Sequence, residues 1–168
     1  KLIVIDPRRT ELATQADIHL QTRPGEDPTL LAALLNVILS RGLHDHEFCE
    51  NWVAEGHVEA LADAVQDFTP AYAAERCDVS QADIEEAALL FAHGPTGTAG
   101  TGTGPSMSPY PSLMEHLVIS LNVVCGRWLR EGDARPRGAC SPERPDAALA
   151  LLRGGGRRGA SEARGPAR

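Results

Sequence analysis

Residues 2–6 read LIVID, so that four apolar residues, Leu2–Ile5, are followed by Asp6 and then by Pro7. An unbroken apolar run that ends in a polar residue is typical of a buried parallel strand. In an open α/β sheet, ligands bind beyond the carboxyl ends of such strands. We therefore expect a strand that delivers Asp6 to a ligand-binding edge of a sheet.

The residues that follow predict a second strand and then a series of helices. Apolar and polar residues alternate over Ile18–Gln21, which favours a short strand. In the turn PGEDP (residues 24–28), Asp27 suits the N-cap of a helix and Pro28 its first position. A Leu-rich helix is expected from there to Gly42. Further helices are expected at about 10–16, 45–53, 58–68, 69–77, 80–94 and 112–125, and a strand running into a glycine loop at 96–104.

This order predicts an α/β fold for residues 1–133, a partial Rossmann-like domain with helices packed on a mostly parallel sheet. Residues 134–168 differ in composition: they hold eight Arg and three acids, for a charge of +5 against −12 for residues 1–133. Such a tail buries too little apolar surface to fold, so we predict that it is disordered. GC-rich coding DNA read out of frame gives this composition, so we interpret the tail as a frameshifted, non-native segment. The alternative is a basic tail that contacts an acidic partner or nucleic acid.

Composition excludes several classes of protein. The longest apolar stretch, Leu30–Leu39, is interrupted by Asn36 and is too short for the about 20 residues of a membrane span. Four widely separated cysteines without a CxxC pair favour neither a zinc knuckle nor a disulfide framework. Seven aromatic residues are few for stacking on single-stranded nucleic acid. We therefore expect neither a membrane segment nor a nucleic-acid partner.

Two acidic positions are candidates for ligand binding, and each also has a purely structural interpretation. Asp6 suits hydrogen bonds from ribose hydroxyls and Arg8 suits a phosphate or the face of a purine, but Asp6 also suits a helix cap and Arg8 a solvated surface. The Asp27 carboxylate suits the N–H groups of a guanine edge, but its use as an N-cap is the stronger interpretation and is enough to explain it. The residues alone leave both alternatives open.

The other motifs point to no self-sufficient catalytic site. The run GTGTG (residues 100–104) lacks the spacing of a dinucleotide fingerprint, although its glycines permit close approach of a bulky ligand. A metal at His44-Asp45-His46 is not favoured, because residues i and i+2 point to different sides of a helix and Asp45 suits a cap. Cys125 is expected to be a buried thiol at a helix end.

Taken together, three segments resemble the molybdopterin oxidoreductases of the dimethylsulfoxide reductase type, which include formate dehydrogenases and nitrate reductases. The similarity covers about residues 1–133. Its motifs are a DPR-x-T segment, an AD pair, a PG-[TS]-D turn, an FTP step before a helix, and a glycine loop followed by a helix with an LN-x-x-x-GR end. They stand here as Asp6–Thr10, Ala16-Asp17, Pro24–Asp27, Phe68–Pro70, Gly102–Gly104 and Leu121–Arg127.

The resemblance implies that the chain binds the guanosine half of a bis(molybdopterin guanine dinucleotide) cofactor with molybdenum. It implies that Ile5, Asp6, Pro7 and Arg8 line the nucleotide and that Asp27 reads the guanine. It further implies that Gly102, Thr103, Gly104 and Met107 lie against the pterin. Two residues depart from the family pattern: Glu26 stands where Thr or Ser is usual, and Met107 where many members have Gln.

The resemblance also implies what else the whole protein contains. Its 4Fe-4S cluster motif and its molybdenum ligand lie upstream of the matched region, so we assign no cluster, metal or catalytic residue here. Because Lys1 precedes a strand, we expect an internal fragment, inactive alone, whose partners are the remainder of the catalytic chain and an electron-transfer subunit. The alternative is a nucleotide-binding or interaction module without redox activity. Substrate and compartment, cytoplasm or periplasm, are left open.

Overall fold

Two short parallel strands open the chain in the computed structural model, which describes residues 1–128. Strand β1 (Ile3–Ile5) pairs with β2 (Ile18–Leu20), with Ile3 opposite Ile18 and Ile5 opposite Leu20. The Asp17 carboxylate fixes the start of β1, because its Oδ2 accepts from the Leu2 N–H at 2.8 Å. The two predicted strands are therefore confirmed, and Asp6 follows directly after β1.

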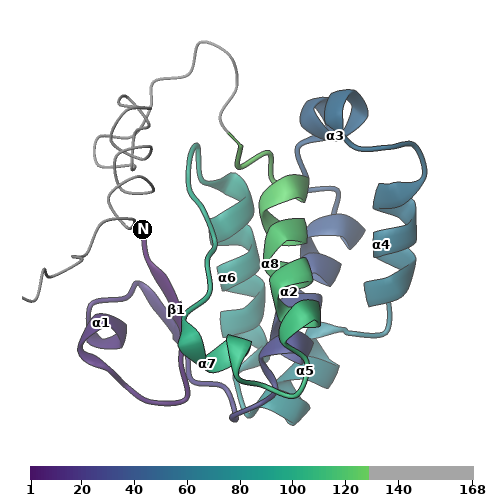
Figure 1. Cartoon of the computed structure of the whole chain (residues 1–168). Coiled ribbons are helices and arrows are strands. Elements are labelled where there is room, and N and C mark those ends of the chain that lie inside the picture. Colours follow the sequence, from purple (N-terminus) through teal and green to yellow (C-terminus); the bar gives the residue numbers. More distant parts are fainter. Residues whose placement is uncertain (129–168) are drawn as a thin grey trace, which may run out of the picture. The chain divides into compact units, whose positions relative to one another are not determined.

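Eight helices complete the described part of the chain (Figure 1). Four of them begin where a side-chain oxygen accepts from the N–H three residues later, at Thr10, Asp45, Thr69 and Ser80. Most of the predicted helices are confirmed within a few residues. Their bounds are α1 (Glu11–Thr14), α2 (Asp27–Ser40), α3 (His46–Trp52), α4 (His57–Val65), α5 (Pro70–Cys77), α6 (Gln81–His93), α7 (Thr103–Ser106) and α8 (Pro111–Val124).

Helix α2 forms the centre of the hydrophobic core. It contacts α4, α5, α6 and α8, and Figure 1 shows it among them. A helix surrounded in this way must be apolar on nearly all sides, and α2 buries Leu30, Leu31, Leu34, Leu35, Val37 and Ile38. Its polar residue Asn36 donates to the Val65 and Gln66 carbonyl oxygens, both at 3.1 Å, and so satisfies the C-terminal end of α4.

The structure corrects the predicted architecture. The described residues are mostly helical, and the sheet has two strands rather than being a layer on which all the helices pack. The predicted strand at 96–104 is wrong: residues 95–102 are irregular and α7 follows. The physical reason is that Ala99 pairs its backbone with the Asn122 side chain on α8 and not with a strand. A Rossmann-like topology stays a prediction.

The division at residue 133 and the disordered tail at 134–168 lie outside the described residues. Within residues 1–128, no helix is both long enough and apolar enough to cross a membrane.

His44, between α2 and α3, gives the fold a predicted dependence on pH. Its Nδ1 atom is buried without a hydrogen-bond partner among the described residues, and its ring centroid lies 3.9 Å from that of His46. Burial, followed by the charge of His46, lowers the pKa of His44 below its ordinary value of 6.5. The His44 ring therefore binds a proton more readily in the unfolded chain than in the folded chain. As a result, the folded state loses stability as the pH falls below about 6.5.

We expect the urea midpoint of the chain to fall between about pH 7 and pH 5, and His44→Gln to reduce that fall. His57→Gln, which changes an exposed histidine at the start of α4, is the matched control and is expected to retain the wild-type dependence. An equal fall in wild type and His44→Gln would contradict this assignment.

Candidate functional site

The segment after β1 forms a tight turn at the carboxyl edge of the sheet. The Asp6 Oδ1 accepts from the Arg8 N–H at 2.7 Å, which leaves Thr10, and not Asp6, as the cap of α1. The Asp6 carbonyl oxygen lies 3.0 Å from the His19 Nε2, and the Gln21 Nε2 donates to the Pro7 carbonyl at 3.0 Å. Strand β2 and the residue directly after it therefore hold the backbone of this turn. The Arg8 guanidinium has no hydrogen-bond or ion-pair partner within residues 1–128 and stays available.

The start of α2 corrects the structural interpretation of Asp27. The helix begins at Asp27 itself, its N-cap residue is Glu26, and no side chain caps it. The cap prediction is therefore wrong. The half-buried Asp27 carboxylate has no hydrogen-bond partner in the described part of the chain. Its acceptor oxygens are consequently free for a ligand.

Glu26, one of the two residues that depart from the family pattern, holds this turn in place. Its Oε1 accepts from the Arg76 Nη2 at 2.6 Å and its Oε2 from the Thr29 Oγ1 at 2.8 Å. The ion pair between a carboxylate and a guanidinium depends on the relative orientation of the two groups. It links the PGED turn to α5, so the neighbour of Asp27 is fixed although Asp27 itself is unpaired.

A cavity of about 1540 Å³ joins these elements to the glycine-rich segment. Eight of the nine predicted cofactor residues line it, and they come from the end of β1, the start of α2 and the segment before and within α7. They are Ile5, Asp6, Pro7, Arg8, Asp27, Gly102, Thr103 and Gly104. The two acids expected to act together therefore face one space. Met107 is not in this wall and is 79% exposed.

The glycines of that wall are not required by the fold. A Cβ atom built on Gly100, Gly102 or Gly104 meets no atom within 4 Å, and Gly102 has φ −97°, which any residue adopts. Packing within residues 1–128 therefore does not explain this composition. At these three glycines no side chain keeps a ligand away from the backbone.

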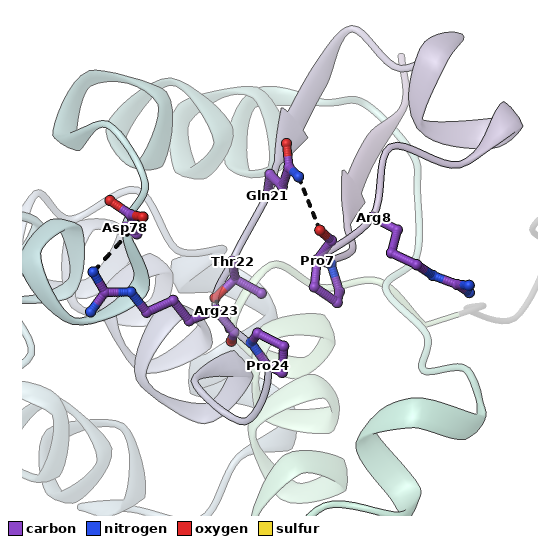
Figure 2. A pocket seen from close by; sticks show the side chains of 7 residues that line it. All are labelled: Pro7, Arg8, Gln21, Thr22, Arg23, Pro24 and Asp78. Carbon is purple, nitrogen blue, oxygen red and sulfur yellow. Dashed lines mark hydrogen bonds and ion pairs between the residues drawn. The ribbon is translucent and has the colours of Figure 1, made fainter.

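A smaller cavity of about 630 Å³ adjoins the first at Pro7, Arg8 and Pro24 (Figure 2). Figure 2 shows the Gln21–Pro7 hydrogen bond and the Arg23–Asp78 ion pair, whose Nη2 and Oδ2 atoms are 3.8 Å apart. Sequence reasoning missed Arg23 and Asp78 as lining residues. The only local signal was the position of Arg23 directly before the turn, since Asp78 comes from the far end of α5.

No metal centre or reactive thiol accompanies the cavities in the described part of the chain. Residues 1–128 contain no group of three or more His, Cys, Asp or Glu that is arranged to hold a metal ion. His44 precedes Asp45 and is not on α3, so its ring does reach that of His46, contrary to the helical-spacing argument. Burial raises the pKa of Cys49 and Cys77, and that of Cys125 to about 11, so these thiols stay protonated near neutral pH.

Several known proteins are similar to this chain in sequence. No family model matches the chain. Over 91 residues, 54% of the chain, it is 43% identical to the alpha subunit of the F420-dependent formate dehydrogenase of Methanocaldococcus jannaschii, of which this is 13%. Over 133 residues, 79% of the chain, it is 31% identical to the molybdopterin-containing subunit of thiosulfate reductase of Salmonella typhimurium, of which this is 17%.

The fold has a counterpart among solved structures. Acetylene hydratase from Pelobacter acetylenicus matches with a TM-score of 0.73 and 33% identity, over 77% of this chain and 18% of that one. The chain thus spans less than one fifth of the length of the relatives it matches. The similarity in sequence and fold, together with the motifs at Asp6–Thr10, Pro24–Asp27 and Leu121–Arg127, shows that the chain belongs to the molybdopterin oxidoreductase family.

Proposed function

We propose that this chain binds the guanosine half of a bis(molybdopterin guanine dinucleotide) cofactor within a molybdenum-dependent oxidoreductase that acts on a small substrate. The observation that carries the proposal is the shared cavity, in which Asp6, Asp27 and a wall of glycines face one space. Its volume of about 1540 Å³ exceeds the about 300–1,000 Å³ of an ordinary small-ligand site, which supports a ligand as large as a nucleotide with its pterin.

Asp27 is the residue proposed to recognise the base. The guanine edge presents two adjacent N–H donors, and an unpaired carboxylate accepts from both at once, as no neutral side chain does. The ion pair between Glu26 and Arg76 holds the residue directly before Asp27, which keeps the carboxylate of Asp27 in position. Asp6 accepts from the ribose hydroxyls, and the unpaired Arg8 binds a phosphate or the face of the purine.

The names of the similar proteins support a role in cofactor binding and not in substrate choice. They include a hydratase, a dehydrogenase and a reductase, although each is similar to the same segment. Proteins that catalyse such different reactions share a cofactor more readily than they share a substrate. Bound molybdenum supplies the two-electron chemistry, and the chain's residues bind and orient the cofactor.

The remainder of the enzyme belongs to the same proposal. The 4Fe-4S cluster, the molybdenum ligand, the remainder of the catalytic chain and an electron-transfer subunit are proposed to lie outside residues 1–128. The isolated 168-residue chain is therefore expected to be inactive. Turnover of formate or nitrate with a redox dye by the purified chain would contradict this part of the proposal.

Titration of the 168-residue chain with GDP and ADP by calorimetry tests the proposal directly. GDP is expected to bind and ADP to bind at least tenfold more weakly, because adenine offers no matching pair of donors to Asp27. Equal binding of the two nucleotides would contradict guanine recognition. Binding of GDP without binding of molybdopterin guanine dinucleotide would favour a nucleotide-binding module that lacks a redox role.

Gly102→Ala is expected to separate cofactor binding from folding. Since the new Cβ meets no atom within 4 Å, the free energy of unfolding should change by less than about 0.5 kcal/mol. Binding of molybdopterin guanine dinucleotide, measured anaerobically by fluorescence, should weaken because the methyl group enters the cavity. Gly97→Ala, which is equally open and lines the same cavity outside the residues proposed to contact the pterin, tests whether the effect depends on the position of the methyl group. A large loss of stability would show that Gly102 serves the fold.

A further inference from the structure

Two polar side chains on α8 hold the glycine-rich segment at the cavity wall. The first is Asn122, which is 8% exposed. Its Oδ1 accepts from the Ala99 N–H at 2.8 Å, and its Nδ2 donates to the Ala99 carbonyl at 2.9 Å. The second hydrogen of Nδ2 goes to the Val118 carbonyl at 2.9 Å. The amide therefore offers Ala99 the donor and acceptor that a neighbouring strand would offer.

The second side chain is Glu115, whose Oε1 accepts from the Thr101 Oγ1 at 2.6 Å. Glu115 and Asn122 are seven residues apart, close to two helical turns, so they lie on the same side of α8 and about 10 Å apart along its axis. Their partners Ala99 and Thr101 occur in the opposite order. The segment thus runs antiparallel to α8 and is fixed at two points, with Gly100 between them and Gly102 and Gly104 beyond.

We infer that Asn122 and Glu115 are positioning residues, which hold residues 98–104 along the cavity so that the cofactor meets a preformed wall. This inference rests on the proposed function. The segment lacks a sheet partner, and beyond Ala99, which packs against the core, its glycines Gly100, Gly102 and Gly104 would place a Cβ in open space. Without external anchors its backbone would sample many conformations, because glycine has the greatest freedom. The two side chains remove that freedom before the ligand binds.

Hydrogen exchange measured by NMR on the 168-residue chain tests the anchoring. The Ala99 amide is expected to be protected in the wild type and to exchange about three- to tenfold faster in Asn122→Ala, the loss typical of one neutral hydrogen bond. Thr101→Val removes the second anchor from the side of the segment and leaves α8 unchanged, so it remains informative if Asn122→Ala fails to fold. Ile119→Ala, an exposed position on α8, is the control.

Binding distinguishes positioning from general stability. Glu115→Ala and Asn122→Ala should weaken binding of molybdopterin guanine dinucleotide several-fold while GDP, which reports on Asp27, binds as in the wild type. Glu115→Gln, which keeps the acceptor oxygen for Thr101, should restore binding. If the wild type binds neither probe, the proposed function fails and this inference fails with it. If the wild type binds both probes and the Ala variants bind equally well, or if Ala99 is unprotected in the wild type, the inference alone is wrong.

Discussion

Replacing Asp27 by Asn is expected to weaken binding of GDP to the 168-residue chain by about 10- to 100-fold. The carboxylate has no partner within residues 1–128, so the substitution breaks no hydrogen bond of the described fold. An Asn side chain still accepts from one guanine N–H, but its NH2 group then faces the second donor and repels it. The loss should therefore exceed that of a single neutral hydrogen bond.

The same substitution should change the preferred base. Xanthine carries a carbonyl oxygen where guanine carries its amino group, so the side-chain amide introduced by Asp27→Asn would accept from one N–H and donate to that oxygen. We expect this variant to bind xanthosine diphosphate more tightly than GDP, the reverse of the wild type. Asp63→Asn, at an exposed position of α4, is the control and should retain the preference for GDP. A variant that loses GDP without gaining xanthosine diphosphate would contradict direct contact between Asp27 and the base.

Truncation of Leu35 to Ala is expected to cost about 2–5 kcal/mol in the free energy of unfolding. Leu35 is 0% exposed and lies on α2, the helix that α4, α5, α6 and α8 surround. The cavity left by its side chain cannot collapse easily, since neighbours enclose it on several sides. Small domains are stable by only about 5–15 kcal/mol, so this change removes a large part of the total.

Urea unfolding followed by circular dichroism measures the effect. Leu113→Ala is the matched control, because Leu113 is on α8 and is 47% exposed; it should change stability by less than about 1 kcal/mol. Similar losses in the two variants would contradict the central position of α2 in the core.

The helices could be predicted from sequence because their signals are local. Thr10, Asp45, Thr69 and Ser80 each cap a helix, and the apolar run after Pro28 extends for the length of α2. The strand LIVID was also readable, because no polar residue interrupts it. These signals depend only on residues that lie close together in the sequence.

What could not be predicted depends on contacts between distant residues. The segment 96–104 has the composition of a strand or a loop, and only its pairing with Asn122, 23 positions from Ala99, decides the outcome. The cap role given to Asp27 was wrong by one position, since Glu26 precedes the helix and reaches Arg76 on α5. Asp6, Arg8 and Asp27 are candidates from the residues alone and the family resemblance adds the others; the structure brings eight of the nine to one cavity.

The most direct measurement is the change in backbone amide shifts of the ¹⁵N-labelled 168-residue chain on addition of GDP. We expect shifts concentrated at residues 5–8 and 25–28, two segments that contribute to the cavity wall, and much smaller shifts with ADP at the same concentration. Shifts confined to α3 and α4, or a spectrum that GDP leaves unchanged, would contradict this expectation.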